Sequence, residues 1–417
     1  MRLFGSDPSH ANSNRHLRVL NVVTAAWHEL THRPASQVPA LDALRAFAVF
    51  MVVGAHYRWP KTAAPVALAH SPIFYYGWTG VDLFFVLSGF LIGKQLWREL
   101  DRTGTVRIPR FLLRRGFRIW PLYFATMAYF VWFSPAHFEW PDWTFLSNYF
   151  VTGYGRSWSL STEEQFYIAV PILLLVIARY LPKKAHAWAI VGLMLAVPLI
   201  RVFEWRYART LGLTPEALVD RMSYPIHLHC ESLLFGLLLA LLSTRHPRIF
   251  VPTGRWGTSP LAIGVTTACI VVGMALDIYD KDVFAYFALA LIYGSLTFFV
   301  LCDRSFLTHP LRSKFFYPFS RLAFGMYLNH LWIAPGSTAW TIRHLSGVLP
   351  PLLVFIAGLL IATAISVSAA VLTFMVIEHP FLQLRDHWLA DKPTVHREAR
   401  ATDGLVPVQA MEPASRS

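Results

Sequence analysis

Apolar runs close to 20 residues long recur along this chain and constrain its fold more than any other feature. Examples lie at 261–276, 283–302 and 352–377. A helix of about 20 residues crosses the hydrocarbon core of a bilayer. Of the 417 residues, 15% are charged, against about 25% in a soluble domain. The sequence therefore predicts an all-α, polytopic membrane helical bundle.

About ten transmembrane helices are expected. They lie at 39–58, 79–97, 114–133, 160–180, 187–203, 227–244, 260–276, 283–302, 318–336 and 350–377. Basic residues cluster in alternate connecting segments, at 98–115, 179–184, 245–255 and 303–314. The segments 59–78 and 134–159 hold one Lys or Arg each. Since Lys and Arg accumulate in cytoplasmic loops, both termini are predicted to be cytoplasmic.

The chain divides into three parts. Residues 1–38 form a cytoplasmic segment in which 15–33 is suited to an amphipathic helix on the membrane surface. Residues 39–386 form the membrane domain, and 387–417 form a polar tail expected to be disordered. The net charge of +13 falls in short clusters between apolar runs, which argues against nucleic acid as a partner.

Arg45 and His56 bound the apolar stretch RAFAVFMVVGAH in the first expected span. Their spacing of 11 positions returns them to nearly the same helix face, separated by about 16 Å of rise. Ionisable residues in spans cost roughly 3 kcal/mol and tend to face the bundle interior or a cavity. Snorkelling to the two interfaces explains the pair equally well. The predicted topology puts Arg45 toward the cytoplasm and His56 toward the outside.

Polar residues also mark the next two spans. Asp82 lies near the outer end of the second span, and Ser88 and Gly89 lie in its middle, where small residues favour close helix packing. The stretch RRGFR begins the third span. Its arginines fit either topological anchoring or a site for a multiply phosphorylated ligand, because planar guanidinium groups pair well with phosphates.

The fourth span opens with SWSLSTEEQFYIAVP at the outer face. Glu163 and Glu164 lie in its first turn, where the helix dipole favours acids. Capping alone does not require the setting of Trp158, Gln165 and Tyr167 around them. Glu163 and His56 fall at a similar depth, and a carboxylate can orient a histidine as a general base for a hydroxyl nucleophile.

Two later stretches add histidines. HLHCESLLFG holds His227, His229, Cys230 and Glu231, but no complementary ligand cluster appears elsewhere, so no metal is expected. His330 lies in the ninth span within FGMYLNH.

Six motifs occur in one order: LDALRAFAVFMVVGAHY, GVDLFFVLSGFLIG, FLLRRGFRIWPLYF, SWSLSTEEQFYIAVP, FGMYLNH and IEHPF. Over residues 39–386 this set resembles the acyltransferase-3 family of integral membrane O-acyltransferases. The resemblance implies transfer of an acyl group, commonly acetyl, from cytoplasmic acyl-CoA to a hydroxyl. The acceptors it implies are polysaccharides, lipid-linked sugars, peptidoglycan or secreted metabolites. It also implies the bacterial cytoplasmic (inner) membrane.

The resemblance also implies site residues. Arg45 and His56 match the family's arginine-x10-histidine motif, and Glu163 matches its outer-span glutamate, whereas the family varies more at Glu164. The candidate catalytic residues are His56, Glu163, Glu164 and Arg45. The candidate substrate-binding residues are Arg114, Arg115, Arg118, Asp82, Ser88, Trp158, Tyr167, His227 and His330. The family often has His-x-Arg-x-Asp where this chain has His227, His229 and Glu231, so the roles of these three stay open.

The resulting hypothesis places the phosphates of acyl-CoA near the RRGFR arginines and its arm past Arg45. His56, oriented by Glu163, takes the proton of the acceptor hydroxyl, and an acyl-histidine intermediate stays open. Acyl-CoA serves as donor substrate, with no permanently bound cofactor. The other expected partners are the glycan acceptor, the lipid bilayer and a further copy of the chain. A transporter or flippase, or a catalytically inactive scaffold, is the alternative. The acceptor and the acyl chain stay open.

Overall fold

The computed structural model describes residues 23–389, apart from gaps at 35–36, 58, 60–65, 67, 69–70, 134–137 and 151–156. These residues form helices, and no strand occurs among them. The long helices are α2 (Pro39–His56), α4 (Gly80–Thr103), α5 (Ile108–Phe133), α7 (Trp158–Tyr180), α8 (His186–Thr210), α10 (Glu231–Arg245), α11 (Pro260–Tyr279), α12 (Lys281–Cys302), α13 (Phe316–Leu345) and α14 (Pro351–Thr373). The short ones are α3 (Pro72–Tyr75), α6 (Trp140–Trp143), α9 (Pro215–Ser223) and α15 (His379–Trp388).

Each of the ten expected spans overlaps one of the long helices, which confirms the helical membrane bundle. Within the described ranges, seven helices are long and apolar enough to cross a membrane. The other three are α5, α10 and α13. α10 has 15 residues, while α5 and α13 carry arginine, serine and histidine side chains that line interior cavities. The cytoplasmic placement of the termini stays a prediction.

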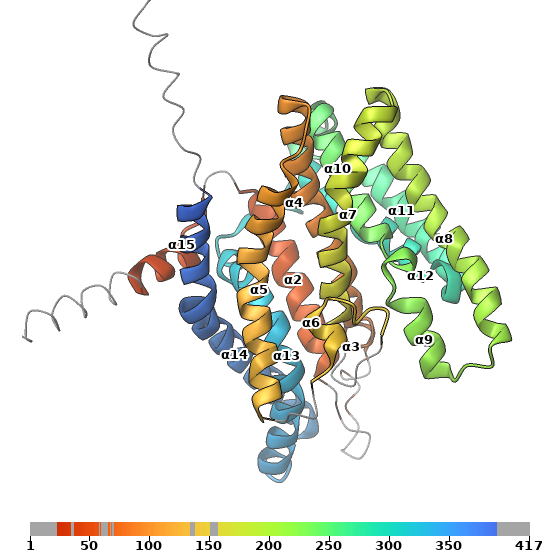
Figure 1. Ribbon diagram of the computed structural model, residues 1–417. Coiled ribbons are helices and arrows are strands. Elements are labelled where there is room, and N and C mark those ends of the chain that lie inside the picture. The colour runs from red at the N-terminus through yellow and green to blue at the C-terminus, as the bar shows by residue number, and fades with distance from the viewer. Residues whose placement is uncertain are drawn as a thin grey trace, which may run out of the picture.

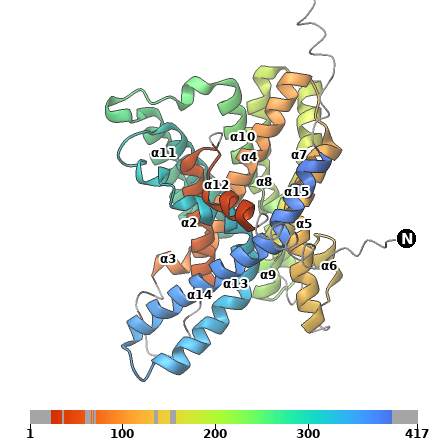
Figure 2. The same ribbon diagram turned by 90° about the vertical axis from the view of Figure 1, so that its left-hand side faces the viewer.

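The bundle has two flanks around α2 (Figure 1). Helices α8, α11 and α12 gather on one flank, and α13, α14 and α15 on the other. α2 packs against α4 and α13. The antiparallel pair α13 and α14 projects from the rest of the bundle (Figure 2). This arrangement brings the polar residues of α2, α4, α5, α7 and α13 toward a common interior.

Helices α4 and α10 pack closely against each other, and this packing depends on glycine. A Cβ atom on Gly89 would lie 2.1 Å from the carbonyl oxygen of Leu233, and one on Gly236 would lie 2.1 Å from that of Val86. Any larger residue would force the backbones apart. The small-residue packing expected around Gly89 is therefore present.

The described part of the N-terminal segment packs on the bundle. Residues 23–31 are helical, and Ala26 and Leu30 are buried in one cluster with Phe374. Glu29 pairs with Arg321 of α13. The rest of the expected surface helix, 15–22, lies outside the described residues, as does most of the tail expected to be disordered, 390–417. The start of that tail, at 387–388, still belongs to α15.

Candidate active site

An inner cavity of about 120 Å³ lies among α2, α4, α5, α7 and α13. Six residues selected from the sequence line it: Arg45, Ser88, Arg115, Arg118, Glu163 and Tyr167. Three guanidinium groups thus surround the same space as one carboxylate. Because ionisable groups in a membrane interior are costly, their concentration around one cavity indicates a functional site.

Glu163 is the acidic group of the inner cavity. The hydroxyl of Ser88 on α4 donates a hydrogen bond to its carboxylate. The hydroxyl of Tyr167, one turn further along α7, donates a second one to the same oxygen. These two donors hold the carboxylate in place between α4 and α7.

Glu164 points in another direction. Its carboxylate accepts a hydrogen bond of 3.0 Å from the indole nitrogen of Trp120 on α5. Successive residues of an α-helix are turned by about 100°, so neighbouring glutamates cannot share one face. The structure therefore places Glu164 against α5, away from the lining of the inner cavity.

A basic groove of about 610 Å³ lies between α4 and α5. Six cationic side chains line it: Lys94, Arg98, Arg102, Arg107, Arg110 and Arg114. Glu99 is the acidic residue of its lining and lies 3.7 Å from Arg107. The positive charge of this groove suits a ligand that carries several phosphate groups.

The structure separates the three arginines expected to bind phosphates. Arg114 lines the basic groove, whereas Arg115 and Arg118 line the inner cavity. Arg115 lies between the two spaces. Its guanidinium group donates to Gln95 at 3.4 Å and lies over the ring of Phe111, and both of these residues line the groove.

An outer cavity of about 550 Å³ lies among α2, α9, α12 and α13, close to the start of α7. Imidazole and aromatic side chains dominate its lining, among them His56, Trp78, Trp158, His229, Tyr286 and His330. The rings of His56 and His330 lie 4.7 Å apart between centroids, edge to face. Two of the candidate histidines, from spans far apart in the sequence, thus meet in this cavity.

In both histidines, Nδ1 forms a hydrogen bond with a backbone carbonyl group. Nδ1 of His56 lies 2.9 Å from the carbonyl oxygen of Val52. Nδ1 of His330 bonds to the carbonyl oxygen of Tyr327. Because a carbonyl oxygen can only accept, each Nδ1 carries the proton in the neutral ring, and Nε2 carries the basic lone pair.

Tyr327 and Val81 line both the inner and the outer cavity. The hydroxyl of Tyr327 is hydrogen-bonded to the hydroxyl of Ser159. Glu163 lines the inner cavity and His56 the outer one. The carboxylate expected to orient His56 therefore bonds to Ser88 and Tyr167 in this structure, and the Val52 carbonyl orients the imidazole.

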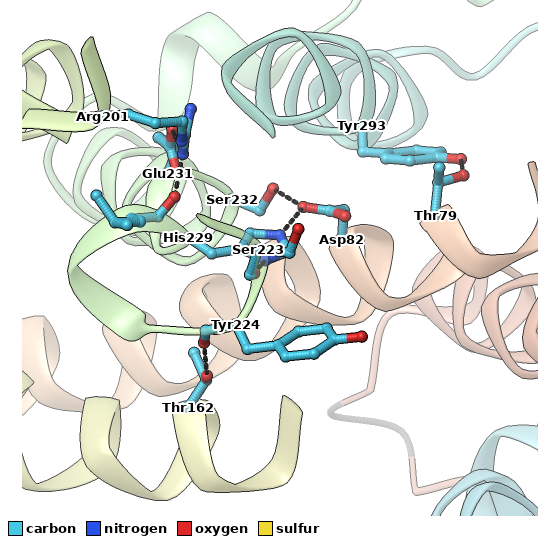
Figure 3. A network of polar contacts seen from close by, with 11 residues as sticks. Thr79, Asp82, Thr162, Arg201, Ser223, Tyr224, His229, Glu231, Ser232 and Tyr293 are labelled. Carbon is cyan, nitrogen blue, oxygen red and sulfur yellow. Dashed lines mark hydrogen bonds and ion pairs between the residues drawn. The ribbon is translucent and has the colours of Figure 1, made fainter. Parts of the chain in front are cut away.

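Asp82 forms a buried polar cluster with His229 and Ser232 (Figure 3), and His229 lines the outer cavity. The carboxylate of Asp82 accepts hydrogen bonds from Ser232 at 2.8 Å and from Nε2 of His229 at 3.1 Å. Nδ1 of His229 lies 2.7 Å from the carbonyl oxygen of Ser223. Both ring nitrogens of His229 therefore lie at hydrogen-bonding distance from oxygen atoms. Asp82 thus contacts His229, which in turn lines the outer cavity.

A buried ion pair supports this cluster (Figure 3). Arg201 of α8 and Glu231 of α10 lie 2.6 Å apart, with no exposed side-chain surface. Arg201 also donates to the carbonyl oxygens of Val283 and Leu228. The pair therefore ties α8, α10 and α12 together beneath the residues that carry His229.

His227 lies apart from these spaces. It is exposed, and its Nδ1 lies 3.1 Å from the hydroxyl of Tyr149. Within the described part of the chain, no group of three or more His, Cys, Asp or Glu residues is arranged to hold a metal ion.

Several residues of these sites were not selected from the sequence. Tyr327 and Ser159 separate the cavities, and Gln95 links the groove to Arg115. Five cations accompany Arg114 in the groove. Lys94, Arg98 and Arg102 follow one another at intervals of four residues, a helical spacing that places them on one face. This spacing predicts a basic helix face, but the accumulation of Lys and Arg in a cytoplasmic segment explains most of the same residues.

The family model described as "Acyltransferase domain" matches residues 38–371. The peptidoglycan O-acetyltransferase OatA of Listeria monocytogenes is 30% identical over 190 residues, which cover 38% of this chain and 28% of the relative. The putative peptidoglycan O-acetyltransferase YrhL of Bacillus subtilis is 28% identical over 245 residues, covering 52% and 34%.

The O-acetyltransferase OatA of Staphylococcus aureus is 24% identical over 359 residues, covering 79% of this chain and 56% of the relative. The chain thus spans between about a quarter and somewhat more than half of the length of these curated relatives. No solved structure matches the chain.

Proposed function

Because this chain belongs to the acyltransferase-3 family of membrane proteins, we propose that it is an O-acyltransferase. It moves an acyl group, most simply acetyl, from cytoplasmic acyl-CoA to a hydroxyl group of a carbohydrate, glycolipid or secreted metabolite. The observation that carries this proposal is the series of three spaces. A basic groove, an inner cavity lined by arginines and an outer cavity lined by histidines follow one another.

The basic groove suits the phosphorylated end of the donor. Coenzyme A carries its phosphates at one end and its thiol at the other, joined by an extended neutral arm. Six cations with one carboxylate between them match the charge of the phosphorylated end. The arm then passes Arg115, which contacts residues of the groove and also lines the inner cavity. The thioester thus enters the inner cavity beside Arg45 and Glu163.

The outer cavity supplies the base. His56 presents Nε2 as its basic nitrogen when Nδ1 donates to Val52. In the transfer, Nε2 takes the proton from the acceptor hydroxyl while the oxygen bonds to the thioester carbon. The carbon–sulfur bond breaks, and the thiolate of coenzyme A receives the proton in turn. The thioester reaches His56 after the hydrogen bond between Tyr327 and Ser159 opens.

The relatives support a glycan as acceptor, since two of them are named as peptidoglycan O-acetyltransferases.

The acidic group of the inner cavity, Glu163, has a separate role in the proposed transfer. Glu163 balances part of the charge of Arg45, Arg115 and Arg118 around the thioester. Charge arranged in advance in a site of low dielectric constant stabilises a transition state effectively.

The test uses purified protein in lipid nanodiscs with acetyl-CoA labelled in the acetyl group. Fragments of peptidoglycan glycan serve as acceptor, and product is separated by chromatography. The proposal predicts label on the glycan and release of one free thiol for each acetyl group transferred. Movement of the glycan across proteoliposomes without acetyl-CoA, and with no label transferred, would indicate a transporter or flippase instead.

A further inference from the structure

The carboxyl end of α15 contacts α5, one of the two helices that line the basic groove. The two helices lie side by side in both ribbon views (Figures 1 and 2). Trp388, the last residue of α15, meets Phe117 of α5 edge to face, with 6.0 Å between the ring centroids. Leu389 follows directly as the C-cap of the helix. This ring contact holds the end of α15 at a defined place on α5.

Two arginines of the basic groove share one acceptor at this helix end. The carbonyl oxygen of Leu389 accepts a hydrogen bond of 2.7 Å from Arg110 and one of 3.2 Å from Arg114. Both arginines line the groove. The last carbonyl groups of an α-helix lack partners within the helix and form the negative end of its dipole, so they attract cations. The end of α15 therefore brings two guanidinium groups close together.

Positive charge exceeds negative charge at this place. A helix C-terminus carries the equivalent of about half an elementary charge, whereas the two arginines carry one full charge each. Glu99 of the groove lies 3.7 Å from Arg107, and Asp386 of α15 lies 2.8 Å from Arg385, so these carboxylates pair with other arginines. Arg114 is exposed. The arginine pair thus suits an anion with more than one negative charge and several acceptor oxygens.

We propose that Arg110 and Arg114, brought together by the carboxyl end of α15, bind the 3′-phosphate of coenzyme A. Each phosphate of the diphosphate bridge in coenzyme A carries a single negative charge. The 3′-phosphate is a phosphomonoester, with close to two negative charges at neutral pH and three terminal oxygens. This inference rests on the proposed function, in which acyl-CoA is the donor. Trp388 and Leu389 are positioning residues, because they act on the phosphate through the two arginines.

The probes are coenzyme A and 3′-dephospho-coenzyme A, which differ only in this phosphate group. Isothermal titration calorimetry measures the dissociation constants of both with the full-length protein in nanodiscs. Arg114→Ala removes one guanidinium group of the pair, and Arg98→Ala, on the α4 side of the same groove, is the matched control. Trp388→Ala removes the ring contact that holds α15, whereas Trp388→Phe keeps an aromatic ring there. Thermal unfolding in detergent verifies that the variants are folded.

The wild-type protein is expected to bind coenzyme A about tenfold more tightly than the dephospho form, as for one charge-assisted hydrogen bond. Arg114→Ala loses this preference, whereas Arg98→Ala weakens the binding of both ligands by the same factor. Trp388→Ala loses part of the preference, and Trp388→Phe keeps it.

Equal binding of the two ligands by the wild-type protein would overturn the proposal. An unchanged preference in Arg114→Ala or in Trp388→Ala would do the same. If the wild-type protein binds neither ligand, the proposed function itself loses its donor, and this inference fails with it.

Discussion

Glu163 and His56 line two different cavities, and Tyr327 forms part of the wall of both. The hydroxyl of Tyr327 is bonded to Ser159, which lines the inner cavity. A wall one side chain thick thus separates the arginines from the histidines. In the proposed transfer, this wall keeps water and acceptor away from the thioester until the two cavities are joined.

Tyr327→Phe removes the hydroxyl group from this wall and keeps the ring. The loss of one hydrogen bond favours the open state by about threefold to tenfold. Release of free thiol from acetyl-CoA without an acceptor is expected to rise by the same factor. Tyr123→Phe is the matched control, because the hydroxyl of Tyr123 is buried and bonds to Asp142, away from both cavities. Equal hydrolysis in the two variants would refute the role of Tyr327.

The basic groove makes donor binding sensitive to charge and salt. Arg98→Ala and Arg102→Ala are each expected to weaken the binding of coenzyme A about twofold to fivefold at low salt, and less at high salt, where exposed charges are screened. Isothermal titration calorimetry at two salt concentrations measures the change. Arg209→Ala is the control, since Arg209 is exposed on α8. If both groove variants bind coenzyme A as tightly as the wild-type protein, the groove does not bind the donor, and its arginines serve only to anchor the topology.

The ion pair between Arg201 and Glu231 makes the bundle vulnerable at one point. Removing one partner leaves an uncompensated buried charge, so Arg201→Met or Glu231→Leu should lower the free energy of unfolding by about 3–5 kcal/mol. The double variant should be more stable than either single one. Thermal unfolding in detergent compares the four proteins. Single variants as stable as the wild type would show that the pair is dispensable.

Because of Asp303, the free energy of unfolding is expected to depend on pH. Asp303 follows α12, and burial raises the pKa of its carboxyl group, but hydrogen bonds from Ser305 and Thr308 outweigh burial and leave the pKa below its usual value of 3.8. Because the pKa of Asp303 is lower in the folded protein than in the unfolded chain, the ionised carboxyl group stabilises the folded state above pH 3.8. This stabilisation is lost as the pH falls through the folded-state pKa. Asp303→Asn should therefore lower the free energy of unfolding by about 1 kcal/mol at neutral pH.

The difference between Asp303→Asn and the wild-type protein should shrink as the pH falls below 3.8. Unfolding midpoints measured from pH 7 to pH 3 follow it. Asp277→Asn is the control, because Asp277 is exposed, and it should change little at any pH. A constant difference across this range would contradict the assignment.

The sequence was sufficient for the fold but only partly for the site. Apolar runs determine where membrane helices form, and Gly89 of α4 correctly predicted close packing. The spacing of Arg45 and His56 predicted a shared helix face, and they line the inner and the outer cavity of the bundle. Helical periodicity says which residues share a face of one helix.

What the sequence did not provide was the contact between helices. A matched depth suggested that Glu163 meets His56, but depth leaves open which side chain lies between them, and that side chain is Tyr327. In the same way, Arg114 and Arg115 are neighbours in sequence and lie in different spaces. Such placements depend on the rotation of each helix against its neighbours, which packing decides.

The most direct test of the account is acetyl transfer by His56→Ala. Labelled acetyl-CoA and peptidoglycan glycan fragments are incubated with the wild-type protein and with the variant, after confirming that both bind coenzyme A equally well. Loss of a general base predicts that the variant transfers label at least about a hundredfold more slowly. A folded variant that transfers acetyl as fast as the wild-type protein would contradict the account.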